Sequence, residues 1–339
     1  KSGIVPLLGV NSLSGHKHKR QEESIKRAAD MVAYVKKKGF GGAFWYIGNE
    51  EGHLHGGTAG YAKAFKIHAL AMKKIDPEIK IFWNSNHVNE NVISTFFKHD
   101  GGTSDGIETH GKWPFGGKPK GLALGTFKRW QEEHPLIEKK KSTRVWRDVA
   151  QTYRKIAEKY GRKDYLIANN EYGIGNIDKK DTEFNRFRYG LIMTDMLQEH
   201  FIGGWDMTCF WDTVRGDVNG LICKMNEYKK NPLHMGMELL AEAQGGEMLE
   251  LVSDNKYTYG FAALKDKLLM VYLINKSKEN QSVKFNITGA QVKSGQAIIM
   301  EDTKDHWGEL TKKRISKKGS DFVINIPGLS YSQFSFTAK

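Results

Sequence analysis

The chain has 339 residues, of which 39% are hydrophobic and 11% aromatic, a composition typical of packed globular domains and not of disordered chains. Its 52 Lys and Arg against 39 Asp and Glu give a net charge of +13, which fits either a solvated cationic surface or an anionic polymer as partner. No nucleic-acid partner is expected, because the sequence has neither zinc-finger spacing nor the aromatics of an RNA-recognition motif. It also lacks a run of 18 apolar residues, so we predict no membrane span.

The start of the chain, its cysteines and its histidine pairs bear on processing, disulfide bonds and metal binding. The sequence begins at Lys1 without a start Met, so we expect a processed or truncated polypeptide that is secreted, periplasmic or on the outer surface, with its signal peptide outside this sequence. Cys209 and Cys223 are too few for a disulfide framework or a thiolate metal site, and a single bridge between them stays open. The His-x-His pairs at 16–18 and 53–55 lack acidic or thiolate companions at ligand spacing, so no metal is predicted.

Up to about residue 245, short apolar β-type runs alternate with amphipathic helical runs, the pattern of parallel α/β architecture. The expected strands span 4–10, 43–47, 79–83, 106–109, 165–168 and 204–210, and the expected helices span 21–38, 58–75, 88–99, 144–160, 183–200 and 233–244. These six βα units fall short of the eight in a closed (β/α)8 TIM barrel. Because the first residues already read as a strand, we expect the first two units to be missing from this chain.

Two further regions differ from this alternation. The stretch 111–142 is rich in Gly, Lys and Pro and is too long for an ordinary connection, so it is expected to carry function or disorder. After residue 245 the chain reads as short strands separated by turn residues, which predicts an antiparallel β-sandwich. The predicted domains are the barrel over 1–245 and the sandwich over 246–339. The expected strands of the sandwich are 257–264, 268–274, 282–287, 296–300, 321–326 and 333–337.

Two of the barrel strands end on the same dipeptide. Residues 43–50 read Ala-Phe-Trp-Tyr-Ile-Gly-Asn-Glu and residues 165–173 read Tyr-Leu-Ile-Ala-Asn-Asn-Glu-Tyr-Gly, so each apolar run closes on Asn-Glu. The carboxyl ends of parallel barrel strands face one mouth, so Glu50 and Glu171 are expected to flank a bound substrate. Glycoside hydrolysis needs this arrangement, because one carboxylic acid protonates the leaving oxygen while a second carboxylate attacks the anomeric carbon. A purely structural role at a strand end would explain one such glutamate better than a matched pair.

These phrases resemble clan A of the glycoside hydrolases, the retaining enzymes built on a (β/α)8 barrel. The resemblance implies that Glu50 is the general acid/base after the fourth strand and Glu171 the nucleophile after the seventh. It implies that Asn49 hydrogen-bonds the sugar hydroxyl beside the anomeric carbon. Retention requires the two carboxyl groups about 5–5.5 Å apart, and we predict that separation. The chemistry requires no cofactor.

Other polar and aromatic residues follow the ends of the predicted strands and are candidates for contact with the substrate. His110, after the sixth strand, is expected to contact the substrate or the nucleophile, whereas Glu108 is expected to point away from the mouth. Asn170 is a candidate to hold the nucleophile, and the resemblance places Trp211 at the floor of the subsite for the cleaved sugar. The remaining candidate substrate-binding residues are Asn11, His53, Asn84, Asn86, Trp113 and Arg215.

The region after the barrel resembles the C-terminal domains of the arabinofuranosidase and β-xylosidase families of the clan, and also that of family 86, the agarases and porphyranases. Both Asn-Glu phrases and the long 111–142 stretch favour family 86, which implies an endo-acting enzyme on red-algal galactan. A sulfated galactan suits the positive charge, with Arg215 as the first candidate to pair with sulfate. The alternatives are a β-xylosidase or α-L-arabinofuranosidase of clan A, and a non-catalytic carbohydrate-binding protein.

Overall fold

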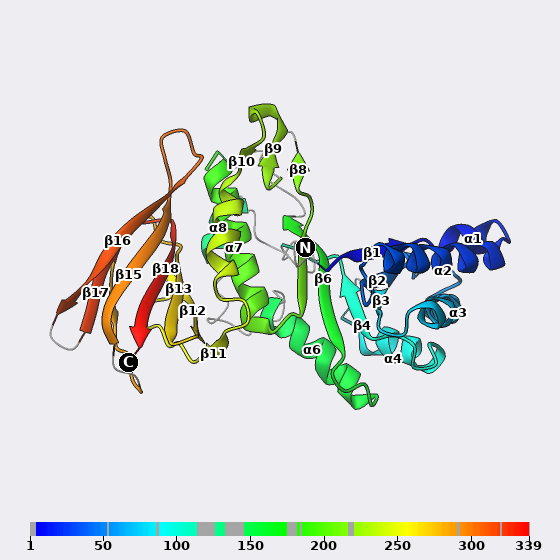
Figure 1. The fold of residues 1–339 in the computed structure, drawn as a ribbon. Helices are drawn as coiled ribbons and strands as arrows, with labels where there is room; N and C mark the ends of the chain where they lie inside the picture. The colour runs from blue at the N-terminus through cyan, green and yellow to red at the C-terminus, as the bar shows by residue number, and fades with distance from the viewer. Residues whose placement is uncertain are drawn as a thin grey trace. The chain divides into compact units, whose positions relative to one another are not determined.

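The computed structural model describes residues 5–52, 54–85, 88–113, 126–132, 146–174, 182–183, 185–215, 220–289, 292–318 and 321–338. The chain divides into two compact units (Figure 1). Within the described ranges, no helix combines the length and the apolarity that crossing a membrane requires. The first unit comprises Lys1–Gly111, Arg147–Tyr172 and Gly203–Cys209, and the second comprises Lys112–Trp146, Gly173–Ile202 and Phe210–Lys339.

A curled parallel sheet forms the first unit, with its strands side by side in the order β1-β2-β3-β4-β6 and with β7 paired to β6. Because the strands are parallel, the residues that follow their carboxyl ends all emerge at one edge of the sheet. The strands are β1 (Leu7–Val10), β2 (Phe44–Ile47), β3 (Lys80–Asn84), β4 (Gly106–Thr109), β6 (Leu166–Ile174) and β7 (Met207–Phe210). The helices are α1 (Leu13–Lys17), α2 (Gln21–Lys37), α3 (Thr58–Ile75), α4 (Glu90–His99) and α6 (Trp146–Lys159).

Aromatic packing joins the helices of this unit to its sheet. Trp83 of β3 stacks on Phe96 of α4 with ring centroids 3.9 Å apart, and both side chains are fully buried. The hydroxyl of Tyr61 on α3 donates to the carbonyl of Ile47 at 2.5 Å and accepts from the backbone N–H of Asn84 at 3.0 Å. The side chain of Tyr61 therefore connects the carboxyl ends of β2 and β3.

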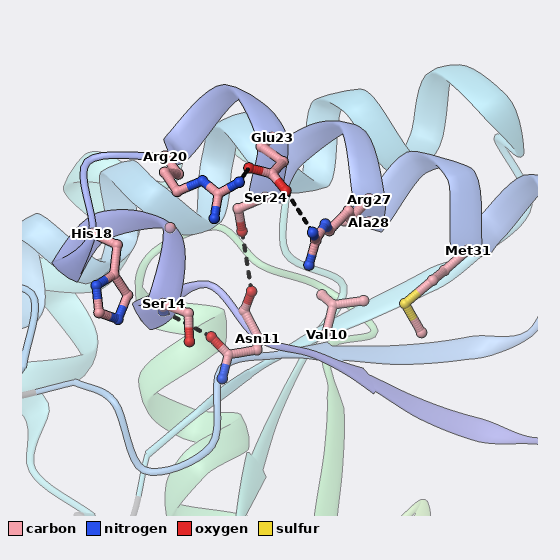
Figure 2. Close-up of a pocket in the computed structure, with 11 residues that line it drawn as sticks. Val10, Asn11, Ser14, His18, Arg20, Glu23, Ser24, Arg27, Ala28 and Met31 are labelled. Carbon is pink, nitrogen blue, oxygen red and sulfur yellow. Dashed lines mark hydrogen bonds and ion pairs between the residues drawn. The ribbon is translucent and has the colours of Figure 1, made fainter.

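A cavity of about 330 Å³ lies in the first unit between the end of β1 and the start of α2 (Figure 2). Figure 2 shows Arg20 and Arg27 both reaching Glu23, and each of these ion pairs measures 2.5 Å. Asn11 lies on the other side of the cavity, where its Oδ1 accepts from the backbone N–H of Ser14 at 2.8 Å. The two guanidinium groups share the single carboxylate of Glu23, so one net positive charge remains beside the cavity.

The second unit begins with short elements and ends in a large antiparallel sheet. Its strands follow the order β11-β12-β13-β18-β15-β16-β17-β14, and a separate three-stranded sheet has the order β10-β9-β8. The elements before the large sheet are β5 (Lys112–Trp113), α5 (Thr126–Glu132), the long helix α7 (Arg186–Gly203), β8 (Val214–Arg215), β9 (Ile222–Cys223), the 3-10 turn η1 (Lys224–Asn226), β10 (Lys229–Lys230) and α8 (Pro232–Ala241). The large sheet comprises β11 (Glu247–Leu249), β12 (Thr258–Lys265), β13 (Leu268–Asn275), β14 (Gln281–Phe285), β15 (Val292–Glu301), β16 (Glu309–Lys318), β17 (Asp321–Ile326) and β18 (Ser330–Ala338).

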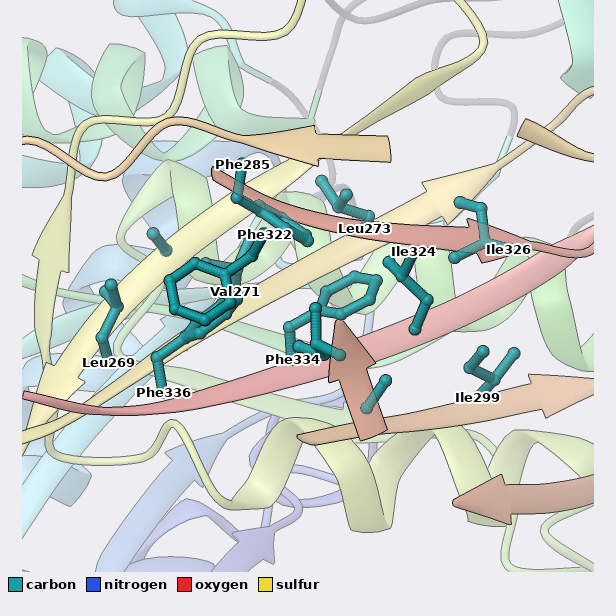
Figure 3. Packing of buried hydrophobic residues seen from close by; sticks show 13 residues of the cluster. Leu269, Val271, Leu273, Phe285, Ile299, Phe322, Ile324, Ile326, Phe334 and Phe336 are labelled. Carbon is teal, nitrogen blue, oxygen red and sulfur yellow. The ribbon is translucent and has the colours of Figure 1, made fainter. Parts of the chain in front are cut away.

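The large sheet curls over its own hydrophobic core (Figure 3). Phe285 of β14 contacts Phe334 of β18 with ring centroids 4.7 Å apart, although three strands lie between β14 and β18 in the sheet order β18-β15-β16-β17-β14. On the opposite face of this sheet, Tyr259 donates to Asp195 of α7 at 2.8 Å, and Lys276 pairs with the same carboxylate at 3.0 Å. One face of the sheet therefore encloses aromatic residues while the other holds α7 through buried polar groups.

The predicted elements of both regions are largely confirmed, with ends that differ by a few residues. The predictions missed the helix α1 and the strands β8, β9, β10, β11 and β16, and the stretch 111–142 contains β5 and α5 where we expected a loop. The parallel strands form an incomplete barrel in the part of the chain that the structure describes. The C-terminal strands form one continuous sheet, so a two-sheet sandwich and a domain boundary near residue 245 stay predictions.

Candidate active site

Glu50 lies in the tight turn that follows β2. The backbone N–H of Gly48 bonds to the carbonyl of Val10 at 2.9 Å, which extends the pairing of β2 with β1 by one residue. Gly48 has φ +82, and a Cβ there would come within 2.9 Å of the Glu51 carboxylate, so the turn requires glycine. Glu50 itself has φ +56, and its side chain is 56% exposed. Asn49 is exposed beside it.

A buried polar cluster fixes the residue after Glu50, and we name Ser12, Glu51 and His55 the Glu51 anchor. The hydroxyl of Ser12 donates to Oε2 of Glu51 at 2.6 Å, and Nε2 of His55 lies 2.9 Å from the same oxygen. Each of the three residues is less than 5% exposed. Because Ser12 follows β1, this anchor joins the turn that carries Glu50 to the neighbouring strand.

His110 and Glu171 are brought together by an amide clasp between β4 and β6. The backbone N–H of Gly111 donates to Oδ1 of Asn169 at 3.0 Å, and Nδ2 of Asn169 donates back to the Gly111 carbonyl at 3.2 Å. Asn169 is fully buried. The residue after His110 is thereby held against the strand that carries Glu171.

The imidazole of His110 is the point where the candidate carboxylates meet. Its Nδ1 lies 2.9 Å from Oε1 of Glu50 and 3.7 Å from Oε1 of Glu171. The His110 side chain is 2% exposed, while that of Glu171 is 18% exposed. His110, which follows β4, therefore contacts both Glu50, which follows β2, and Glu171 of β6.

Glu108 also belongs to this cluster, and the expectation that it points away was wrong. It is fully buried, its Oε1 accepts from Nδ2 of Asn84 at 2.6 Å, and its Oε2 lies 3.4 Å from Nε2 of His110. Burial raises the pKa of Glu108 to about 8; the Asn84 hydrogen bond lowers it, and the charges of Glu171 and Glu50 raise it. Residues two apart on a strand share a face, so Glu108 and His110 point the same way.

Tyr46 and Asn170 complete the cluster. The side chain of Asn170 hydrogen-bonds both Tyr46 and Glu108. Burial raises the pKa of Tyr46, and the charges of Glu108 and Glu171 raise it further. Tyr46 was not predicted as a site residue, although its place in β2 between the buried Trp45 and Ile47 could have indicated that it faces the other side.

The other residues predicted for the site lie at several places in the structure. Asn84 is 4% exposed and its side-chain amide donates a hydrogen bond to Glu108. Asn11 lines the cavity of Figure 2. In the second unit, Trp211 is 50% exposed, Arg215 is exposed with its Nε 3.9 Å from Oδ2 of Asp212, and Trp113 belongs to β5. His53 and Asn86 lie outside the described residues. Cys209 and Cys223 are not joined by a disulfide.

No protein-family model and no curated protein matches this chain. Solved structures do match. CelM2, a bifunctional glucanase-xylanase from a metagenome library, has a TM-score of 0.69 at 15% identity, with 94% of this chain and 69% of that chain covered. A family 44 xyloglucanase from Paenibacillus polymyxa has a TM-score of 0.67 at 15% identity, with 91% and 70% covered. An α-L-arabinofuranosidase from Thermotoga maritima has a TM-score of 0.61 at 17% identity, with 86% and 65% covered.

These structures are clan A glycoside hydrolases, and at such identities the likeness shows a shared fold. The chain therefore has the α/β fold of the TIM-barrel glycoside hydrolases, with the barrel incomplete over the described strands. The resemblance to clan A inferred from the two Asn-Glu phrases is confirmed at the level of fold.

Proposed function

We propose that this chain is a retaining glycoside hydrolase that cleaves a polysaccharide, with Glu171 as nucleophile and Glu50 as general acid/base. The observation that carries the proposal is the approach of both carboxylates to Nδ1 of His110, at 2.9 and 3.7 Å. Oxygens that share one nitrogen at these distances fit a retaining pair, about 5–5.5 Å apart, better than an inverting pair at about 6.5–9.5 Å.

The exposure of the two side chains supports the division of roles. Glu50 is 56% exposed, which suits a residue that must reach the leaving-group oxygen and exchange protons with water. Glu171 is 18% exposed, which suits a carboxylate that attacks only a sugar bound in the site. A proton on Nδ1 of His110 can stabilise the negative charge of either carboxylate.

The proposed reaction has two displacements. In the first, a Glu171 oxygen bonds to the anomeric carbon while the bond to the leaving oxygen breaks, and Glu50 gives its proton to that oxygen. In the second, Glu50 takes a proton from water, the water oxygen bonds to the anomeric carbon, and the ester bond to Glu171 breaks. The sugar leaves with its original anomeric configuration, and both carboxyl groups return to their starting protonation states.

For the substrate, we propose a red-algal galactan cleaved internally, as by a β-agarase or β-porphyranase of family 86. The two Asn-Glu phrases and the net charge of +13 support this choice, since cationic side chains attract a sulfated polymer. A polysaccharide is too large to enter a cell, so we also propose that the protein is secreted, periplasmic or on the outer surface. The xylanase and arabinofuranosidase named among the structural relatives support the alternative, a clan A enzyme that acts on xylan or arabinan.

The catalytic roles can be tested with Glu171→Ala and Glu50→Ala on an activated aryl glycoside with added azide. We expect Glu171→Ala to lack turnover until azide attacks the sugar directly and yields a glycosyl azide of inverted configuration. Glu50→Ala should form the glycosyl-enzyme, slow its hydrolysis by about 10²–10⁴-fold, and yield an azide of retained configuration. Exposed Glu78, which precedes β3 at the other edge of the sheet, supplies the control Glu78→Ala. Reversed configurations, or full activity of both variants, would contradict the assignment.

The substrate can be tested by product analysis on agarose, porphyran, xylan and arabinan. Oligosaccharides released from agarose or porphyran would support the galactan proposal, and a series of products of intermediate length would support internal cleavage. Products from xylan or arabinan alone would favour the alternative. Tight binding without cleavage of any polymer would show a carbohydrate-binding protein and overturn the proposed reaction.

A further inference from the structure

The candidate site holds a third carboxylate that the proposed reaction does not use. Glu108 is fully buried and lies on the same strand face as His110, with its Oε2 3.4 Å from Nε2 of the imidazole. On the other side of that ring, Nδ1 faces Glu50 and Glu171. The imidazole is thus placed between one buried carboxyl group and the two proposed catalytic ones.

We propose that Glu108 is a positioning residue that holds His110 by Nε2, so that the N–H of Nδ1 points at Glu50 and Glu171. The inference rests on the proposed function of those two residues, because it assigns Glu108 a role in that reaction. The bond from Asn84 to Oε1 of Glu108, at 2.6 Å, leaves Oε2 as the oxygen that faces the imidazole. The position of the third carboxyl group is therefore set independently of His110.

The protonation state of Glu108 decides which tautomer of His110 it supports. A neutral imidazole has one N–H and one acceptor nitrogen. A protonated Glu108 donates its O–H to Nε2, which leaves the N–H on Nδ1, directed at the catalytic carboxylates. An ionised Glu108 accepts from Nε2 instead, and the acceptor nitrogen Nδ1 then faces two carboxylates with its lone pair.

The surroundings of Glu108 favour the protonated form near neutral pH. Burial is the largest cause that raises its pKa to about 8, and the charges of Glu171 and Glu50 act in the same direction. The other titratable groups that face it come from three further elements: Tyr46 of β2, Tyr61 of α3 and Cys209 of β7. The pKa values of these three groups are raised, so they are neutral where Glu108 titrates.

The decisive variant is Glu108→Gln, whose amide N–H donates to Nε2 as the protonated acid would but does not titrate. We expect its kcat/KM to stay within about threefold of the wild-type value near pH 7, where Glu108 is still mostly protonated. The ratio of variant to wild-type kcat/KM should rise above pH 8, because only the wild type loses the donor. Glu78→Gln, an exposed change at the other edge of the sheet, should give a ratio that does not vary with pH. A flat ratio for Glu108→Gln would overturn the proposal.

A spectroscopic measurement separates this inference from the proposed function. Selective ¹⁵N labelling of histidine, with the His110 signals assigned by loss in His110→Asn, reports the tautomer in the resting protein. Where the imidazole is neutral, the wild type should carry its N–H on Nδ1 below the pKa of Glu108, near pH 7, and on Nε2 above it, near pH 9, whereas Glu108→Gln keeps it on Nδ1. The same tautomer in both proteins at every pH would overturn the role of Glu108. Because the measurement needs no turnover, it tests Glu108 even if the chain hydrolyses no glycoside.

Discussion

At the scale of single residues, Gly9 has a consequence for the site because it lies against Tyr46. A Cβ at residue 9 would fall 2.4 Å from Cζ of the tyrosine ring. Gly9→Ala should therefore displace Tyr46 from Asn170, destabilise the protein by about 1–3 kcal/mol and lower kcat. Steady-state kinetics and urea unfolding check this. Gly41→Ala is the control, since its Cβ would meet Asp76 at an ordinary 3.6 Å, and equal kinetics for the two variants would contradict the prediction.

A second residue, His200 of α7, sets a pH dependence of stability. It is 1% exposed, and burial lowers its pKa to about 3. From its ordinary pKa of about 6.5 downward, the unfolded chain binds a proton that the folded chain does not, so His200 contributes stability above that pH and loses it as the pH falls to about 3. His200→Gln should remove up to about 5 kcal/mol of this acid sensitivity. Urea unfolding over this pH range measures it. The exposed control His18→Gln should follow the wild type, and a parallel His200→Gln curve would refute the prediction.

At the scale of elements, the Glu51 anchor holds the turn between β2 and α3. Glu51→Ala leaves Ser12 and His55 without their buried partner, which should cost about 1–3 kcal/mol of stability. Since Glu50 is the preceding residue, kcat should fall about tenfold while KM changes little. Glu51→Gln, which keeps an oxygen acceptor, should recover part of the loss, and exposed Glu22→Ala should change neither quantity. A loss of stability with unchanged kcat would limit the anchor to a structural role.

The elements that could be predicted are those whose apolar pattern is local. The run Phe44–Ile47 and the helix Thr58–Ile75 are visible in the sequence because their burial follows a regular period. Strand β16 was missed because Glu309–Lys318 is mostly charged and has few apolar residues. Its strand structure comes from pairing with β15, for example Ile315 opposite Gly295, which no local pattern reveals.

The sequence predicted those residues of the candidate site whose side chains can take part in catalysis and that also follow a recognisable strand. Glu50, Glu171 and His110 each follow a recognisable strand, and the structure brings them together. The role of Glu108 could have been predicted from its spacing of two from His110, and was assigned wrongly only because the strand face was assigned wrongly. The hydrogen bonds of Asn170 to Tyr46 and Glu108 join three strands. Local sequence patterns could not predict them, because they depend on how the fold places these strands side by side.

At the scale of the whole molecule, the net charge of +13 gives a way to distinguish substrates. If the natural substrate is sulfated, added salt screens its attraction to the protein, and KM should rise several-fold between about 0.05 and 0.5 M NaCl. KM on neutral agarose should change little over the same range. Initial rates on the two polymers measure the difference. An equal response to salt on both would show that the charge of the protein plays no part in substrate choice.

Glu50 carries a proposed catalytic side chain at a backbone conformation that favours glycine and therefore lowers stability. A residue with a side chain costs about 1–2 kcal/mol in the left-handed region that Glu50 occupies at φ +56, whereas glycine adopts it freely. We therefore expect Glu50→Gly to unfold at a higher urea concentration than Glu50→Gln, although both variants would lose most of their activity; equal midpoints would contradict this. Selection for durability alone would replace the glutamate. A lineage released from selection for catalysis would then lose this carboxylate early and gain a more stable protein.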